Sequence, residues 1–246
     1  MGSAPADAIL KRLRSLANPQ NVEGMARFGI STCQEALGIP APVLHKIARE
    51  IGRNHALALE LWESGVHDTR CVAALIDDPK LVTEEQMERW ARDFDNWAVC
   101  DNCCGRLFDK TPLAYRKALE WSRREEEYVK RAAFSLMAAL AVHDKQAADA
   151  KFLRFLPLIQ RQSTDERNFV KKAVNWALRQ IGKRSLDLNQ AAIRTAERIR
   201  KIDSPSARWI AADALWELRG DAVQQRLRRK RGSSLVKSGV RPTQPG

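Results

Sequence analysis

A tryptophan and an aspartate lie four residues apart in the segment FDNWAVCDNCCGRLF, at Trp97 and Asp101. Side chains at this spacing are neighbours on a helix surface. They flank a stripe of mostly small, apolar side chains formed by Asn96, Cys100, Cys103, Cys104 and Leu107. We expect Asp101 to be an unpaired carboxylate next to an indole, and a fixed negative charge in a partly dry site can stabilise a developing cation or orient a water molecule. Such pairs also arise by chance in ordinary helices, so this pair alone leaves catalysis open.

A second segment, NFVKKAVNWALRQIGKR, combines an apolar stripe with a cationic face. Successive residues of a helix are about 100° apart around its axis. One side of this helix therefore carries Val170, Ala173, Val174, Ala177 and Ile181. The opposite side carries an aromatic among cations, namely Lys172, Trp176, Arg179 and Lys183. Trp176 either packs into a neighbouring repeat or contacts a sugar or base of a nucleic acid whose phosphates the cations hold.

The segment VKRAAFSLMAAL places one arginine opposite its apolar stripe. Val129, Ala133, Leu136 and Leu140 share the predicted buried direction, and Arg131 lies on the far side beside Ser135 and Ala138. Small neighbours should leave its guanidinium accessible to a phosphate, which it can bind with two parallel hydrogen bonds. A solvated surface arginine is the alternative.

These side chains should be positioned by a stack of helix pairs. Apolar residues recur at spacings of three and four, which predicts helices throughout and no strand. Asn18-Pro19, Thr111-Pro112 and Ser204-Pro205 are typical helix starts, as are Thr83 with Gln86 and Ser163 with Glu166. The segments at Val129 and Val170 match in pattern at an offset of 41 residues, the period of a helix-pair repeat. We therefore predict an all-α helical repeat protein with a continuous concave surface.

Charge indicates a polyanionic partner. The 246 residues include 42 Lys and Arg against 30 Asp and Glu, with a pI near 9.8. Clustered Lys and Arg are typical of phosphate binding, although an ordinary basic surface is the alternative. Residues 222–246 contain seven basic and no acidic residues. We predict a repeat domain over residues 1–221 and a disordered basic tail over residues 222–246.

Other function classes are disfavoured. No run of 18 apolar residues exists, and the N-terminus lacks the apolar stretch of a signal peptide, so we expect a cytoplasmic protein without a membrane partner. The five cysteines are Cys33, Cys71, Cys100, Cys103 and Cys104. Because the CxxCC cluster has no second cysteine pair and no histidine at ligand spacing, we expect neither a metal site nor another cofactor. We expect a monomer.

The sequence resembles the AlkD-type DNA alkylation repair glycosylases from about Asn18 to about Leu218. The segments that carry the resemblance are MARFGI, LWESGVHDTR, WARDFDNWAVCD, VKRAAF and NFVKKAVNWALRQIGKR. The resemblance implies a HEAT-like repeat fold. It also implies removal of cationic alkylated purines, such as 3-methyladenine and 7-methylguanine, from double-stranded DNA without pulling the lesion into a pocket.

The same resemblance assigns roles to individual residues. Asp101 resembles the catalytic carboxylate of the family, and Trp97 and Trp176 resemble the two aromatic residues that press on the lesion's deoxyribose. Arg131 resembles the active-site arginine near the phosphate backbone. Phe28 stands where the family often has Tyr in its MARY motif, so a polar contact from that hydroxyl is lost. Lys172, Arg179, Lys183 and Phe28 are the predicted DNA contacts.

The implied mechanism needs no general acid and no metal, because an alkylated purine leaves as a neutral base. Asp101 would stabilise the positive charge that moves onto the sugar and position the attacking water, with the indole faces adding cation-π attraction. A non-catalytic HEAT-like protein that binds distorted or branched DNA is the alternative. A protein-binding scaffold is disfavoured, because its groove would carry Arg131, Lys172, Arg179 and Lys183.

Overall fold

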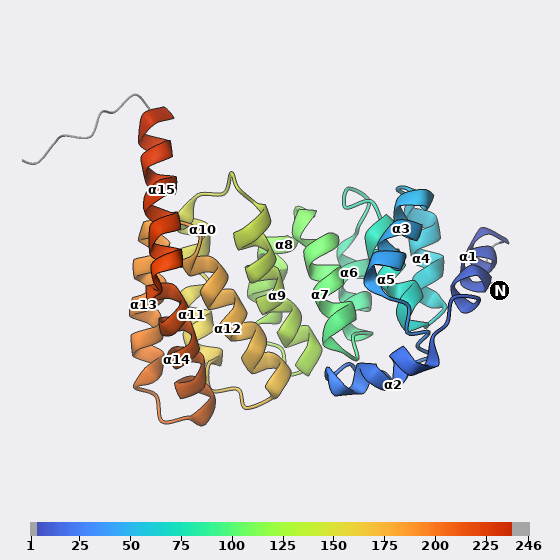
Figure 1. The fold of residues 1–246 in the computed structure, drawn as a ribbon, viewed down its shortest axis with the longest axis horizontal. Helices are drawn as coiled ribbons and strands as arrows, with labels where there is room; N and C mark the ends of the chain where they lie inside the picture. Colours follow the sequence, from blue (N-terminus) through green and yellow to red (C-terminus); the bar gives the residue numbers. More distant parts are fainter. Residues whose placement is uncertain (1–3, 238–246) are drawn as a thin grey trace, which may run out of the picture. The chain divides into compact units, whose positions relative to one another are not determined.

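The computed structural model describes the backbone of residues 4–237 and the side chains of residues 5–230, and this part of the chain is helical without strands (Figure 1). The all-α prediction is confirmed. The helices form two compact units, residues 1–136 and 137–246. Helix α9, Glu127–His143, supplies its first turns to one unit and its last turns to the other. None of the helices within residues 4–237 has the length and apolar character needed to cross a bilayer.

The first unit consists of short helices that pack in sequence order. Besides the start of α9 they are α1 (Ala4–Arg14), α2 (Pro19–Arg27), α3 (Ala41–Ile51), α4 (His55–Glu63), α5 (His67–Ile76), α6 (Glu84–Arg92), α7 (Trp97–Arg106), the 3-10 helix η1 (Phe108–Lys110) and α8 (Ala114–Trp121). Helix α5 packs against α3, α4 and α7. Helix α2 runs across the direction of α3 and α5 (Figure 1).

Polar side chains mark where several of these helices begin. Asn18 and Thr83 each accept a hydrogen bond from a backbone N–H group in the first turn of α2 and α6, as the sequence predicts. The prediction at Thr111 is wrong: α8 begins at Ala114, and Thr111 Oγ1 instead donates to the Phe108 carbonyl at the end of η1. A residue type that suits a helix cap therefore does not by itself locate a helix start, because the residues after Thr111 do not form the first turn of α8.

Stacked indoles form the centre of the first unit. The rings of Trp62 and Trp90 are parallel within 3°, with centroids 3.9 Å apart. Both side chains are fully buried, and Trp62 Nε1 donates to Asp93 Oδ2 over 2.7 Å. Phe94 and Phe108 lie against the pair at 6.2 Å. The aromatic cluster therefore joins α4, the end of α6 and η1 into one core.

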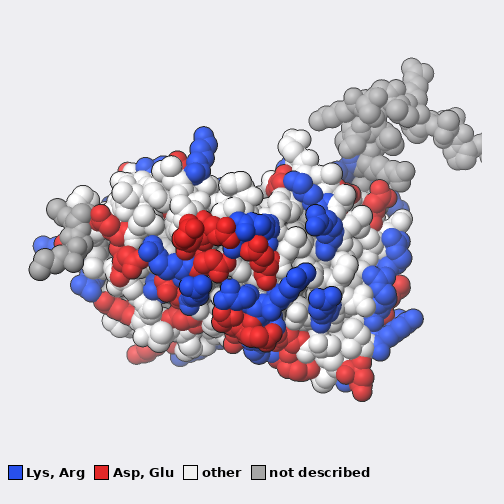
Figure 2. Space-filling view, turned by 180° about the vertical axis from the view of Figure 1, so that it is seen from behind, with Lys and Arg blue, Asp and Glu red and all other residues white. Residues whose placement is uncertain are grey.

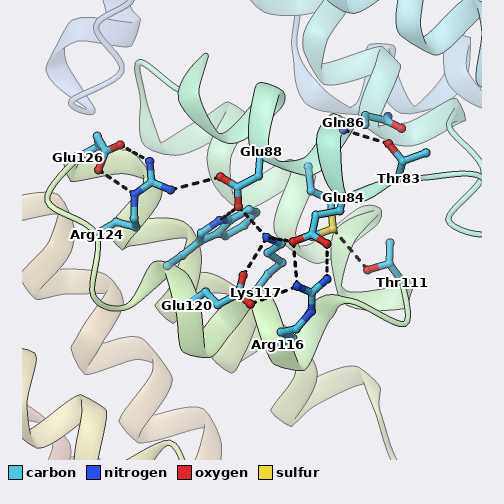
Figure 3. A network of polar contacts seen from close by, with 12 residues as sticks. Thr83, Glu84, Gln86, Glu88, Thr111, Arg116, Lys117, Glu120, Arg124 and Glu126 are labelled. Atoms are coloured by element: carbon cyan, nitrogen blue, oxygen red, sulfur yellow. Dashed lines mark hydrogen bonds and ion pairs between the residues drawn. The ribbon is translucent and has the colours of Figure 1, made fainter.

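A charged network ties α6 to α8 (Figure 3). Lys117 is buried, and its Nζ lies 2.6 Å from Glu84, 2.8 Å from Glu88 and 2.8 Å from Glu120. Burial alone lowers the pKa of Lys117, but hydrogen bonds to the three carboxylates outweigh that effect and raise it. Trp121 Nε1 donates to Glu88 over 2.7 Å. The buried ammonium thus has enough acceptors to satisfy it.

The second unit contains the longer helices. They are the end of α9, α10 (Asp149–Leu153), α11 (Leu156–Gln162), α12 (Asn168–Gly182), α13 (Leu186–Arg200), α14 (Pro205–Arg219) and α15 (Asp221–Lys237). Helices α12, α13 and α14 pack against one another. The predicted start at Ser204 is confirmed, because its side chain accepts from the Ala207 N–H. The predicted capping box at Ser163 is wrong: Ser163 ends α11, and Glu166 accepts from Ser204 Oγ instead.

The C-terminal segment departs from the sequence prediction. Residues 221–237 form α15, where a disordered tail from residue 222 was expected. Val223 and Leu227, four residues apart, are buried on one side of this helix. Two anchoring side chains suffice to dock a segment whose average composition is polar, because the unit supplies the rest of the apolar surface. The predicted disorder of residues 238–246 lies outside the described residues.

Candidate active site and nucleic-acid interface

Helix α7 positions both residues of the carboxylate and indole pair. Its cap, Asn96, accepts hydrogen bonds from the N–H groups of Ala98 and Val99 at 3.0 and 3.2 Å. The predicted stripe is buried and faces α9, where the thiols of Cys100 and Cys104 donate to the Tyr128 and Ala132 carbonyls. This packing leaves Trp97 and Asp101 half-buried beside the stripe.

The Asp101 carboxylate is bound on both oxygens by α9. Arg131 Nε donates to Oδ1 over 3.0 Å, and Arg131 Nη2 donates to Oδ2 over 2.6 Å. Ser135 Oγ, one turn further along α9, donates to Oδ1 over 2.7 Å. The expectation of an unpaired carboxylate is therefore wrong. The ion pair nevertheless places Arg131 beside Asp101 and near Trp97 in the first unit.

Arg131 is likewise not the open phosphate contact that its projection predicts, since only 6% of the residue is exposed. The predicted stripe with Val129 and Ala133 is buried, but Ala132 and Phe134 are buried too. Helix α9 is thus covered on the side opposite the stripe as well, and α7 covers the position of Arg131. Burial alone lowers the pKa of Arg131, but the nearby Asp101 charge outweighs it and raises the pKa, which keeps the guanidinium charged.

Trp97 is held against α2 by its polar edge. Its indole Nε1 donates to the Phe28 carbonyl over 3.0 Å. Phe28 ends α2, and its own ring is 76% exposed. The contact uses the backbone of Phe28, so replacing a tyrosine by phenylalanine here leaves it intact. The predicted site residues Phe28 and Trp97 therefore meet, at the junction of α2 and α7.

Both aromatic residues line a cavity of about 710 Å³ between α2, α3, α5 and α7. Its walls are mainly apolar, and the polar residues in its lining include His67, Asp68, Cys71 and Asn102. Burial lowers the pKa of His67, which favours a neutral imidazole. The Asn102 amide donates to the Cys71 carbonyl over 3.0 Å and so joins α7 to α5. Sequence reasoning missed this cavity, because a helical projection does not tell how separate helices pack.

In the second unit, α12 presents the predicted aromatic and cationic face. Its apolar stripe is buried, as predicted, while Trp176 is half-buried and Lys172 exposed. Arg179 pairs with Asp213 at 3.4 Å and with Glu217 at 2.9 Å, and Lys183 pairs with Glu217 at 2.7 Å. Two of the three predicted cations thus share acidic partners on α14. Their role in binding DNA stays a prediction.

Two exposed tryptophans on α14 were not singled out from the sequence. Trp209 is 41% exposed and Trp216 80% exposed. They are seven residues apart, so they lie on one face of the helix. Lys171 Nζ lies 5.2 Å from the Trp209 ring centroid, within the range of a cation-π contact. The seven-residue spacing of two tryptophans was the signal that could have identified this face.

The buried cysteines act as core residues. Burial raises the pKa of Cys71 to about 12 and that of Cys103 and Cys104 well above the usual value for a thiol. Within the described part of the chain, no group of three His, Cys, Asp or Glu side chains is arranged to hold a metal ion. The three cysteines of the CxxCC cluster are fully buried, and Cys100 and Cys104 contact α9.

Positive charge is not spread evenly over the surface. On the face shown in Figure 2, basic and acidic side chains lie next to one another. Interleaved charges of both signs cancel at short range, so this face does not present the uniform positive potential that a phosphate backbone requires. On this face, the net charge of +12 does not produce a continuous basic surface.

The packing of these helices defines an all-α, HEAT-like repeat protein. A solved structure from a new family of proteins related to the HEAT-like repeat DNA glycosylases, with affinity for branched DNA structures, has the same fold. The TM-score is 0.70 at 19% sequence identity, over 84% of this chain and 92% of that one.

A family model described as DNA alkylation repair enzyme matches residues 9–218, and the chain belongs to this family. The resemblance noted in the sequence is thereby confirmed. Two relatives from Listeria are similar over 199 residues, 80% of this chain and 87% of each relative. They are the uncharacterized protein Lin0241 of Listeria innocua, at 25% identity, and the uncharacterized protein Lmo0209 of Listeria monocytogenes, at 23%.

Proposed function

We propose that this protein is a DNA glycosylase that excises positively charged alkylated purines, such as 3-methyladenine and 7-methylguanine, from double-stranded DNA. The observation that carries the proposal is the Asp101 carboxylate, held in a fixed orientation by Arg131 and Ser135 beside the Trp97 indole. Membership of the DNA alkylation repair enzyme family supports it. The cytoplasmic location and monomeric state stay predictions.

The proposed reaction depends on the charge of the lesion. Alkylation at N3 or N7 makes the purine cationic, so the electron pair of the breaking glycosidic bond neutralises the departing base. Positive charge then develops at C1′ of the sugar. Asp101 stabilises this charge and orients a water molecule, which adds to C1′ and releases its proton to solvent. Because the base leaves neutral, no side chain has to protonate it.

The neighbouring residues have distinct roles in this proposal. Trp97, fixed by the Phe28 carbonyl, offers an indole face to the cationic sugar. The family resemblance assigns the role of the second indole to Trp176, on α12 of the second unit. Arg131 positions the carboxylate, because its two parallel hydrogen bonds allow one orientation of the group. Lys172 contributes a phosphate contact from its exposed position on α12.

Chromatography of the bases released from methylated duplex DNA tests the proposal. We expect free 3-methyladenine or 7-methylguanine with the wild-type protein and none above background with unmethylated duplex. Release should increase linearly with protein concentration. A protein that binds the methylated duplex but releases no base over hours would exclude the enzymatic function.

A second candidate is non-catalytic binding of branched DNA. The observation that favours it is the pair of exposed tryptophans on α14, since unpaired bases at a branch can stack on indole rings. The solved protein with the same fold is described as having affinity for branched DNA structures. Electrophoretic mobility shifts with a four-way junction and a duplex of equal length distinguish the candidates. Under the second candidate, Trp209→Ala with Trp216→Ala abolishes the preference for the junction, and no base is released.

A further inference from the structure

A cavity of about 280 Å³ in the second unit has several Lys and Arg residues and no Asp or Glu in its lining. It lies between the end of α9, the end of α12 and the helix α15. The lining includes five cationic side chains and three uncharged residues, and these eight residues are Lys145, Lys183, Arg184, Arg226, Lys230, Ala141, Val142 and Gln180. Such a concentration of like charge is unfavourable unless an anion joins it.

The wall of this cavity is fixed by buried hydrogen bonds. Arg184 is buried and donates to the Ala141 carbonyl over 3.2 Å and to the Ala147 carbonyl over 2.5 Å. Its guanidinium also lies 4.2 Å from the Phe152 ring centroid. Lys230 of α15 donates to the Arg184 carbonyl over 2.7 Å. The cationic groups are thus brought together by the fold, and α15 completes the site.

The positive charge in the cavity is only partly balanced. Lys183 pairs with Glu217, and the Arg184 Nε lies 3.7 Å from Asp149. Lys145 and Arg226 form no ion pair with any residue that the structure describes. No acidic residue follows Asp221 in the chain.

Lys230, on α15, has other positively charged residues close to it. Burial, followed by the charges of Arg184 and Lys145, lowers the pKa of Lys230. An adjoining cavity of about 350 Å³ is also lined by Lys145, Arg184 and Lys230. Asp149 and Asp187 line that adjoining cavity and not the smaller one. The smaller cavity adds Lys183 and Arg226 to the three shared cations and has no acidic residue in its lining.

We propose that this cavity is a binding site for a phosphate group, and that in the complex with DNA it holds a phosphate of the backbone. The second part rests on the proposed function. Lys183, the residue directly after α12, follows Trp176 by seven residues, which is roughly 10 Å along a helix. That distance corresponds to about three base-pair steps at 3.4 Å each. On a duplex that runs along α12, the site would hold a phosphate a few base pairs from the position next to Trp176.

The size of the cavity agrees with this ligand. A water molecule occupies about 30 Å³ in the liquid, so 280 Å³ accommodates a tetrahedral phosphate group with part of its hydration shell. Arg226 offers a guanidinium that can bind two phosphate oxygens, and Lys145 offers a compact ammonium on the loop after α9. The lining therefore provides donors from separate elements, which a single surface lysine cannot.

The test compares two variants of equal charge. The pocket variant is Lys145→Ala with Arg226→Ala, and the control is Arg194→Ala with Arg200→Ala, two exposed cations on α13 without described ion pairs. Fluorescence anisotropy with undamaged duplex gives the slope of log Kobs against log salt concentration. We expect the pocket variant to reduce the slope by about 0.9, the value for one phosphate, and the control to leave it unchanged. Equal changes in both variants would overturn the assignment to DNA, because they would show a general charge effect.

Inorganic phosphate is the probe for the site itself. At constant ionic strength, phosphate in place of chloride should raise the Tm of the wild type and not that of the pocket variant. A rise of equal size in both proteins, or in neither, would refute the phosphate site. A rise confined to the wild type, with no change of salt slope, would refute the DNA assignment and leave a site for free phosphate. If the wild type binds no DNA, the proposed function fails, and the Tm comparison still decides the phosphate site.

Discussion

Replacing Asp101 by asparagine separates the structural and the catalytic role of its carboxylate. The substitution preserves the size of the side chain but removes the charge that Arg131 binds. It also removes the negative charge that Asp101 presents to the Arg131 guanidinium. Arg131 is only 6% exposed, so water does not readily replace that charge. We therefore expect Asp101→Asn to lower both the stability of the first unit and the rate of base release.

The loss of stability follows from the burial of the pair. Removing one partner of a buried ion pair costs about 3–5 kcal/mol. The Asp101 side chain is 20% exposed, so water reaches one edge of the pair and the lower value, about 3 kcal/mol, is expected. In a protein of this size, that loss lowers the Tm by roughly 6–12 °C. The double variant Asp101→Asn with Arg131→Met removes both charges and should recover about half of the loss.

Two measurements on the same proteins test this reasoning. Thermal unfolding gives stability, and base release at a temperature well below every Tm gives activity. Asp101→Asn and the double variant should both release bases about a hundredfold more slowly than the wild type, although their stabilities differ. Glu50→Gln removes one partner of the exposed pair with Arg12 and should leave the Tm unchanged. An unaltered Tm for Asp101→Asn would refute the buried pair, and an unaltered release rate would refute its catalytic role.

Three further outcomes are expected. Trp97→Ala should slow base release about tenfold, the value of a lost cation-π contact of about 1.4 kcal/mol, measured on the same methylated duplex; a normal rate would remove the indole from the mechanism. Hydrogen bonds from Arg and Lys side chains lower the pKa of Glu84 and of Glu126 to about 2, so their contribution to stability is present above about pH 4.3 and disappears as the pH falls toward 2. Circular dichroism between pH 7 and pH 2 should show this loss, and Glu84→Gln with Glu126→Gln should diminish it; an identical acid transition in both proteins would contradict the ion pairs. A thiol reagent should modify the exposed Cys33 rapidly in the native protein and the buried Cys103, whose pKa burial raises well above the usual value, only after unfolding; a fast phase that survives Cys33→Ser with Cys71→Ser would contradict this assignment.

Helical period and local spacing predicted which residues of a helix are buried. The stripe of α12 from Val170 to Ile181 is buried as projected, because a period of 3.6 residues depends only on the helix itself. The stripe of α7 follows the same rule. The position of Trp97 beside Asp101 was predictable for the same reason, since both lie on one helix.

Contacts between helices were beyond this reasoning. Arg131 lies 30 residues from Asp101, and a projection gives only the direction in which its side chain leaves α9. What lies in that direction depends on how α7 packs, and α9 proved to be buried on more than one side. The ion pairs of Arg179 and Lys183 with α14 were missed for this reason too. The expected disorder of residues 222–237 was an error of averaging over composition, because Val223 and Leu227 are buried although the segment is polar on average.

The parallel indoles of Trp62 and Trp90 make the two units spectroscopically distinguishable. At 3.9 Å their electronic transitions couple, and the resulting circular dichroism couplet exists only while α4 and α6 are packed together. Trp216, on the second unit, is 80% exposed and emits as an indole in water. Loss of the couplet during denaturation therefore reports on residues 1–136 alone, so a stepwise melt of the two units would be visible without any introduced label.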